Sequence, residues 1–169
     1  MMMLFDTNAL VFLYRNQEDD LNPHKAVKYL FESACRDRIA VAIPAPSLAE
    51  FLIGESDPKK RAEFSRLFSH KSRVFRILPF DSKAAHTCCE ISDRLNRMKM
   101  NESNKEPRQK VKVDRQILAI AACNGIGHFV SSDRQLLNDA RLLGVFREVT
   151  DIRNFPIPHH QDDLFGGLG

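Results

Sequence analysis

Four acidic residues stand where predicted strands end or predicted helices begin: Asp6, Glu50, Asp114 and Asp133. Asp6 directly follows the apolar run Met2–Phe5, and Asp133 follows the run from His128 to Ser131. Glu50 and Asp114 each fall in the first turns of a predicted helix. The carboxyl ends of parallel strands meet at one edge of a sheet, where ligands bind in such folds. A parallel sheet would therefore bring all four carboxylates together.

Clustered carboxylates repel one another, by roughly 4 kcal/mol for a pair about 4 Å apart at a protein-like dielectric. Such a group either takes up protons or binds a cation. Oxygen donors with no His or Cys at ligand spacing suit Mg²⁺ or Mn²⁺ rather than zinc. A water activated by such an ion attacks a phosphodiester. The four acids are thus candidate catalytic residues and candidate metal ligands.

Each acid also has a purely structural interpretation, which the sequence leaves open. Asp6 and Asp133 suit the N-cap of a following helix, at about 1 kcal/mol each. Ser47 and Glu50 have the spacing of a capping box. Asp114 in a first turn gains roughly 0.3–1 kcal/mol from the helix dipole.

Apolar periodicity predicts strands alternating with helices, which indicates an α/β fold with a mainly parallel sheet covered on both faces. We expect strands at Met2–Phe5, Ile39–Ile43, Val74–Leu78, His128–Ser131 and Phe146–Val149. We expect helices at Ala9–Tyr14, from Pro23 to Cys35, at Ser47–Ile53, from Pro58, from Asp81–Ser82 to Met98, at Val113–Asn124 and at Asp133–Leu143.

The 169 residues suffice for one domain. We expect a single domain over residues 1–154, with a polar insertion at about 99–112, and a flexible C-terminal tail over 155–169. The longest apolar run, Ile117–Cys123, is far shorter than the roughly 20 residues of a membrane span. The first residues lack the basic region of a secretory signal, and four cysteines without C-x-x-C spacing fit a reducing compartment. We therefore expect a cytoplasmic protein with no membrane partner.

The formal net charge of +3 conceals an uneven distribution. Lys59–Arg76 holds seven basic residues and one acid, giving +6, and Arg94–Arg115 holds eight and three, giving +5, so the remainder carries 3 − 11 = −8. Basic segments of this kind attract polyanions. Candidate phosphate contacts lie next to Asp114: Arg108, Lys110, Lys112 and Arg115. A solvated loop explains these cations equally well.

Four segments in order resemble the motifs of PIN-domain nucleases. They are Asp6-Thr7-Asn8-Ala9-Leu10, Ser47-Leu48-Ala49-Glu50, the run from Asp114 to Ala122, and Val130-Ser131-Ser132-Asp133. The resemblance runs from about Met2 to Val149 and is strongest to the VapC-type toxins of toxin–antitoxin pairs.

The resemblance implies a three-layer α/β/α sandwich and RNA cleavage that depends on Mg²⁺ or Mn²⁺. It also implies a homodimer and a cognate antitoxin whose tail blocks the acidic pocket. By position, Asp6, Asp114 and Asp133 would be metal ligands, and Glu50 a ligand or an orienter of the attacking water. Asn8 and Ser131 match polar positions that line the family's pocket.

The sequence departs from compact toxins of this type in the polar stretch 101–112 and in the tail after Asn154, and Ser131 stands where threonine is commoner. Two alternatives follow: an orphan or housekeeping RNA-processing nuclease, and a non-catalytic PIN-like scaffold that binds RNA or protein. A receiver-like signalling domain is less favoured, because no Asp-Asp pair follows the first strand.

Overall fold

The sheet of this protein is built from five parallel strands, as seen in a computed structural model that describes residues 2–15, 22–69, 72, 74–99 and 108–158. The strands follow the order β3-β2-β1-β4-β5, and every neighbouring pair is parallel. Their bounds are β1 Met2–Phe5, β2 Ala40–Pro44, β3 Phe75–Leu78, β4 His128–Ser131 and β5 Glu148–Asp151.

Helices connect the strands and make up most of the remaining described structure. They are α1 Thr7–Tyr14, α2 Asn22–Arg36, α3 Ala45–Ile53, α4 Pro58–Leu67, α5 Ser82–Met98, α6 Arg108–Cys123 and α7 Arg134–Leu143. In the described parts of the chain, no helix is both long and apolar enough to span a membrane.

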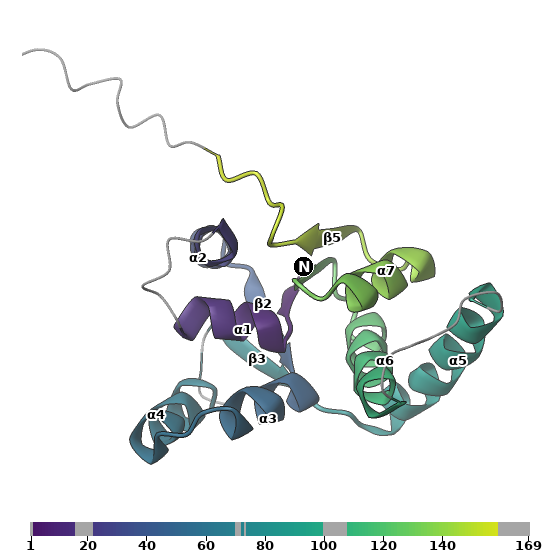
Figure 1. Ribbon diagram of the computed structural model, residues 1–169, viewed down its shortest axis with the longest axis horizontal. Helices are drawn as coiled ribbons and strands as arrows, with labels where there is room; N and C mark the ends of the chain where they lie inside the picture. The colour runs from purple at the N-terminus through teal and green to yellow at the C-terminus, as the bar shows by residue number, and fades with distance from the viewer. Residues whose placement is uncertain (1, 16–21, 70–71, 73, 100–107, 159–169) are drawn as a thin grey trace, which may run out of the picture.

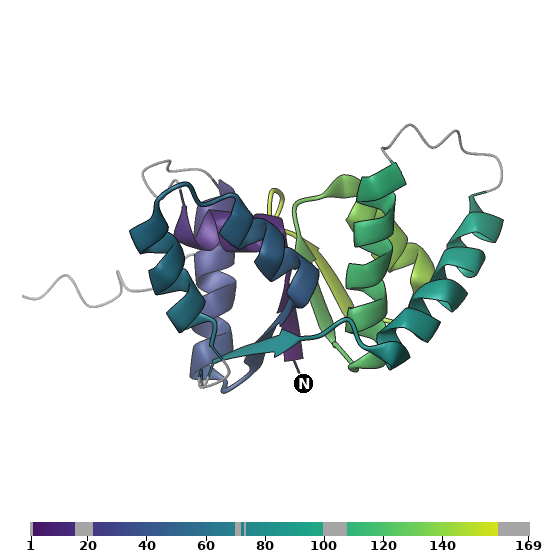
Figure 2. The ribbon, with the colours of Figure 1, turned by 90° about the horizontal axis from the view of Figure 1, so that it is seen from below.

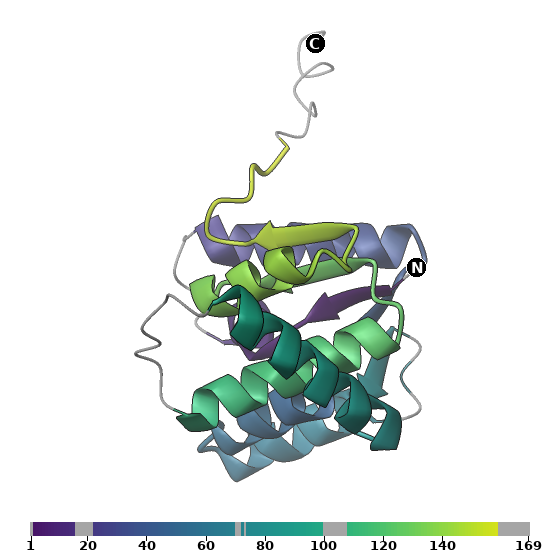
Figure 3. The same cartoon turned by 90° about the vertical axis from the view of Figure 1, so that its right-hand side faces the viewer.

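Two apolar cores, one on each face of the sheet, establish three layers (Figures 1 and 2). Successive strand residues face opposite sides, so Leu4 packs into one core and Phe5 into the other. The core around Leu4 is closed by α5, α6 and α7, which lie over one face of the sheet in Figure 3. The core around Phe5 is closed by α1 to α4. The predicted α/β/α sandwich is confirmed.

The strand order reverses direction at β1, because β2 lies on one side of it and β4 on the other. Open α/β sheets bind ligands at such a switch point, beyond the carboxyl ends of the strands. Phe5 pairs with Val130, so the next residues along the two strands, Asp6 and Ser131, lie side by side at this edge. The fold thus places two of the predicted site residues next to each other.

Several predicted boundaries differ from the observed ones, among them those of α6, α3 and β5. Helix α6 begins at Arg108 instead of Val113, so part of the expected insertion is helical. Helix α3 begins at Ala45, with Pro46 in its first turn, where proline needs no N–H partner. Strand β5 covers Glu148–Asp151 instead of Phe146–Val149, because its pairing with β4 sets its position. Of the expected tail, residues 155–158 are described and 159–169 lie outside the described residues; likewise 100–107 of the insertion.

Candidate active site

Asp6 is held at the switch point by hydrogen bonds to both of its carboxylate oxygens. The residue caps α1, where Oδ1 accepts the N–H of Ala9 at 2.9 Å, and Oδ2 accepts the hydroxyl of Ser131. Only 3% of Asp6 is exposed. Burial raises its pKa to about 6, helped by the negative charges of Asp133 and Glu50 and opposed by the two hydrogen bonds.

Asp133 caps α7 and is paired with a cation. Its Oδ1 accepts the backbone N–H groups of Gln135 at 2.9 Å and Leu136 at 3.1 Å. Its Oδ2 lies 2.9 Å from the Nζ of Lys110, which reaches across from α6. Burial alone would raise the pKa of Asp133, but Lys110 and the cap hydrogen bonds outweigh it and hold the pKa below its usual value. Asp133 therefore stays ionised at neutral pH.

Asp114 lies on α6, four residues after Lys110, and is 8% exposed. Residues four apart share one face of a helix, so both side chains line the same wall. Burial raises the pKa of Asp114 to about 7, and the charge of Asp133 adds to the effect, while Lys110 opposes it. Asp114 thus titrates close to neutral pH.

Glu50 projects from α3 and accepts a hydrogen bond from the hydroxyl of Thr7 at 2.6 Å. The capping-box interpretation is wrong, because Pro44 is the N-cap of α3 and Ser47 lies inside the helix. Thr7 belongs to the first motif, but the sequence analysis predicted no contact or role for its side chain. Its contact with a residue 43 positions away could be found only in three dimensions.

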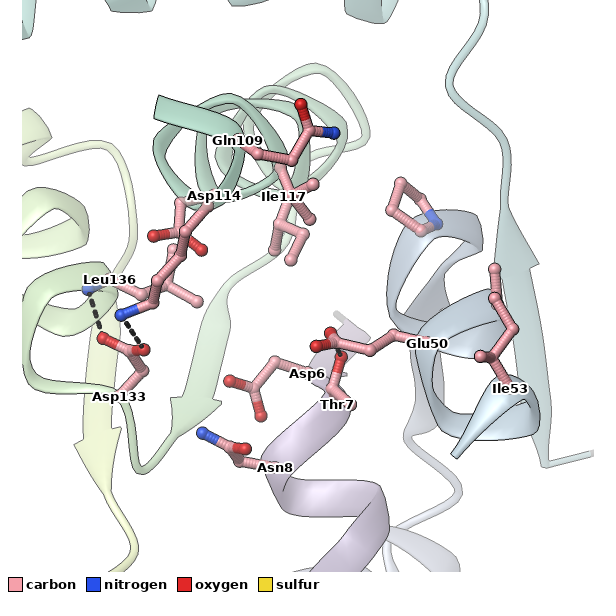
Figure 4. Close-up of a pocket in the computed structure, with 14 residues that line it drawn as sticks. Asp6, Thr7, Asn8, Glu50, Ile53, Gln109, Asp114, Ile117, Asp133 and Leu136 are labelled. Atoms are coloured by element: carbon pink, nitrogen blue, oxygen red, sulfur yellow. Dashed lines mark hydrogen bonds and ion pairs between the residues drawn. The ribbon is translucent and has the colours of Figure 1, made fainter. Parts of the chain in front are cut away.

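All four acids line one pocket of about 530 Å³ (Figure 4). Asn8 lines it as well, and apolar side chains complete the walls, among them Ile53, Ile117 and Leu136. Ser131 is fully buried beneath the pocket, where its hydroxyl oxygen also accepts the N–H of Asp133 at 2.9 Å. The hydroxyl of Ser131 therefore connects two of the acids.

The chemistry of these donors fits a divalent cation, because the charge of Asp133 raises the pKa of both Asp6 and Asp114, and the charge of Asp6 raises that of Asp114. The side chains are nevertheless not preassembled. Within the described ranges, no three His, Cys, Asp or Glu side chains lie close enough to hold a metal ion as they stand. Ser131, Lys110 and Thr7 each hold one of the acids instead. Metal binding would require these carboxylates to turn toward a common point.

The structure separates the four basic residues that were expected to contact RNA. Lys110 lines the pocket, and Lys112 is exposed on the same helix. Arg108 begins α6, and its side chain lies outside the described structure. Arg115 corrects the expectation: it is 5% exposed and lies against Asp139 of α7, 3.9 Å from Nε to Oδ2, and against the carbonyl oxygen of Ile91 in α5. A buried guanidinium that joins three helices is not accessible to a phosphate.

Asp151 and Arg153 add charged side chains to the carboxyl edge of the sheet, and the sequence analysis did not include them. Asp151 ends β5, and its carboxylate binds the guanidinium of Arg153 in bidentate fashion, at 2.9 and 2.6 Å. The bond to Asp151 raises the pKa of Arg153, and the negative charge of Asp133 adds to this effect. Since β5 was predicted to end at Val149, nothing in the sequence placed Asp151 at this edge.

Comparisons with known proteins agree with this fold. The model of the family described as "PIN domain" matches residues 3–141. A solved structure of VapBC2 from Rickettsia felis, bound to a DNA fragment from their promoter, contains a chain that is 16% identical. The match has a TM-score of 0.60 and covers 89% of this chain and 98% of that one. No match was found among curated proteins. The family model spans most of the chain, and the chain therefore belongs to the PIN domain family.

Proposed function

We propose that this protein is a metal-dependent endoribonuclease that hydrolyses RNA phosphodiesters. The observation that carries the proposal is the convergence of Asp6, Glu50, Asp114 and Asp133 on one pocket at the switch point of the sheet. Acidic residues that only cap helices have no reason to surround a single cavity, where their negative charges repel one another. Membership of the PIN domain family, whose members are generally nucleases, supports the same conclusion.

In this proposal Asp6, Asp114 and Asp133 hold Mg²⁺ or Mn²⁺, and Glu50 either joins them or orients the attacking water. When bound, such an ion supplies a water of lowered pKa and neutralises charge that develops on the phosphate. Thr7 fixes the direction of the Glu50 carboxylate through its hydroxyl. The hydroxyl of Ser131 fixes Asp6 in the same way.

The RNA backbone would be held by cations at the start of α6. Lys110 lies in the pocket wall and Lys112 is exposed nearby, and the backbone of Arg108 begins the same helix. Contacts of this kind position a nucleic acid without selecting its sequence. Asn8 adds a polar side chain to the pocket, where it can bind a sugar or phosphate oxygen.

We further propose that the nuclease is the toxin of a toxin–antitoxin pair, acting in the cytoplasm as a homodimer and blocked by an antitoxin protein. Its support is the likeness in fold to the VapBC2 chain from Rickettsia felis. Ile53, 80% exposed at the edge of the pocket, offers an apolar contact to such a partner. Expression of the chain alone should arrest growth, and Asp6→Asn should abolish the arrest.

Cleavage of labelled RNA by the purified protein tests the enzymatic proposal. Asp6→Asn and Asp114→Asn each remove one carboxylate charge with little change in shape. Loss of even an outer partner of a metal ligand typically costs ~10–100-fold, so each substitution should lower the Mn²⁺-dependent rate by about 100-fold or more. Asp93→Asn, at an exposed position on α5, is the matched control. Wild-type rates in either pocket variant, or full activity in EDTA, would exclude the proposal.

A further inference from the structure

Lys110 is a cation built into the acidic pocket. Its Nζ lies 2.9 Å from Oδ2 of Asp133, and 38% of the lysine side chain is exposed, against 18% of the aspartate side chain. Lys110 lies in α6 and Asp133 is the N-cap of α7, and both line the cavity. The ion pair is therefore part of the pocket wall.

One carboxylate oxygen of Asp133 caps α7, and the other forms the ion pair with Lys110. Oδ1 already accepts the N–H groups of Gln135 and Leu136. Oδ2 is the oxygen that Lys110 contacts. A cation that is to be ligated by Asp133 without disrupting the start of α7 must use Oδ2.

We propose that Lys110 is a resident counter-ion of Asp133, which a divalent metal ion must displace before the site can fill. This inference rests on the proposed function, and it assigns Lys110 a positioning role that precedes any contact with RNA. An ammonium group and a divalent cation repel each other strongly at contact distance. The two cations therefore compete for Oδ2 of Asp133.

The position of Lys110 on α6 allows the exchange. Lysine has a flexible four-carbon stem and a compact charge, so the ammonium can swing toward solvent while the helix stays in place. Asp114, on the same face of α6, is drawn toward the incoming ion at the same time. Lys110 thus holds the Asp133 carboxylate in place in the metal-free protein and raises the metal concentration that the site requires.

Calorimetric titration with Mn²⁺ tests this role. Lys110→Met keeps the apolar stem and removes the charge, so Mn²⁺ should bind about tenfold more tightly than to the wild type. Lys28→Met is the matched control, because Lys28 is an exposed lysine on α2, across the sheet from α6. It should leave the Mn²⁺ affinity within about twofold of the wild type, a change of less than about 0.5 kcal/mol.

Equal or weaker Mn²⁺ binding by Lys110→Met, with normal binding by the wild type, would overturn the inference and leave the proposed function intact. Absence of Mn²⁺ binding in the wild type would overturn both. Lys110→Gln gives a second variant, and melting in EDTA confirms that each variant is folded. The rise in Tm caused by a fixed Mn²⁺ concentration should be larger in both Lys110 variants than in the wild type, since tighter binding stabilises the folded state more.

Discussion

Asp114 changes its protonation close to neutral pH, and its burial has a consequence for stability. Its pKa in the folded protein is about 7, against an ordinary value of 3.8. The folded state therefore binds more protons than the unfolded state between these values. Linkage then requires the metal-free protein to lose stability as the pH rises from about 4 to 7. Asp6, with a pKa raised to about 6, acts in the same direction over a narrower range.

Asp114→Asn removes the buried charge and should stabilise the metal-free protein where the carboxylate is ionised. At pH 8 in EDTA we expect a gain on the order of 2 kcal/mol in the free energy of unfolding. At pH 4, where the folded protein holds Asp114 protonated, the gain should vanish. Urea denaturation at the two pH values measures the difference. A gain of equal size at both values would show that packing, and not charge, is responsible.

Ser131 shows how one small side chain joins two acids that are distant in sequence. Its hydroxyl donates to Asp6, and its oxygen accepts the N–H of Asp133 at 2.9 Å. The family motif more often has threonine at this position, and both residues carry the hydroxyl that these two bonds require. The pocket therefore depends on a buried polar atom as well as on its charged groups.

Asp133 both caps helix α7 and lines the pocket. The carboxylate caps the helix through the N–H groups of Gln135 and Leu136, and the other end of α7 closes at Gly144, whose φ of 64° is left-handed. Asparagine is as good an N-cap as aspartate, whereas alanine costs about 1 kcal/mol. Different substitutions at this one position can thus separate stability from metal binding.

Asp133→Asn should keep most of the stability and lose Mn²⁺ binding, because the amide oxygen still caps α7 but the charge is gone. Asp133→Ala should lose both, with a further loss of about 1 kcal/mol in the free energy of unfolding. Urea denaturation and Mn²⁺ calorimetry on the same samples give the two quantities. If Asp133→Asn binds Mn²⁺ like the wild type, the carboxylate is a cap and not a ligand.

Local signals predicted the elements that position the site, and failed where the answer depended on contacts between elements. Periodicity and caps gave β1, β4 and α7, and hence the convergence of Asp6 and Asp133. The position of β5 is set by its register with β4, so the sequence did not predict that Asp151 lies at the edge of the sheet beside Ser131. A basic run shows charge but not burial, and Arg115 was therefore a candidate phosphate contact although its guanidinium lies buried beside Asp139.

The two basic segments, Lys59–Arg76 and Arg94–Arg115, occupy different parts of the fold. The first includes α4, in which no residue is buried, beside α3 on one side of the sheet. The second includes the end of α5 and the start of α6, on the other side, where Lys110 enters the pocket. Two cations of the second segment are used within the protein, since Lys99 forms an ion pair with the buried Asp139 and Arg115 lies beside the same carboxylate. The net charge of +3 therefore does not by itself predict RNA binding, which depends on where the accessible cations lie.

RNA affinity should fall with salt in proportion to the phosphates that the second segment contacts. For single strands, the slope of log K against log salt concentration is about −0.7 per neutralised phosphate. On an Asp6→Asn background, which prevents cleavage, Lys112→Gln should make the slope shallower by about 0.7. Lys28→Gln removes an equal charge from the exposed face of α2 and should leave the slope unchanged. Equal slopes for the two variants would mean that RNA is attracted by net charge alone and that α6 makes no phosphate contact through Lys112.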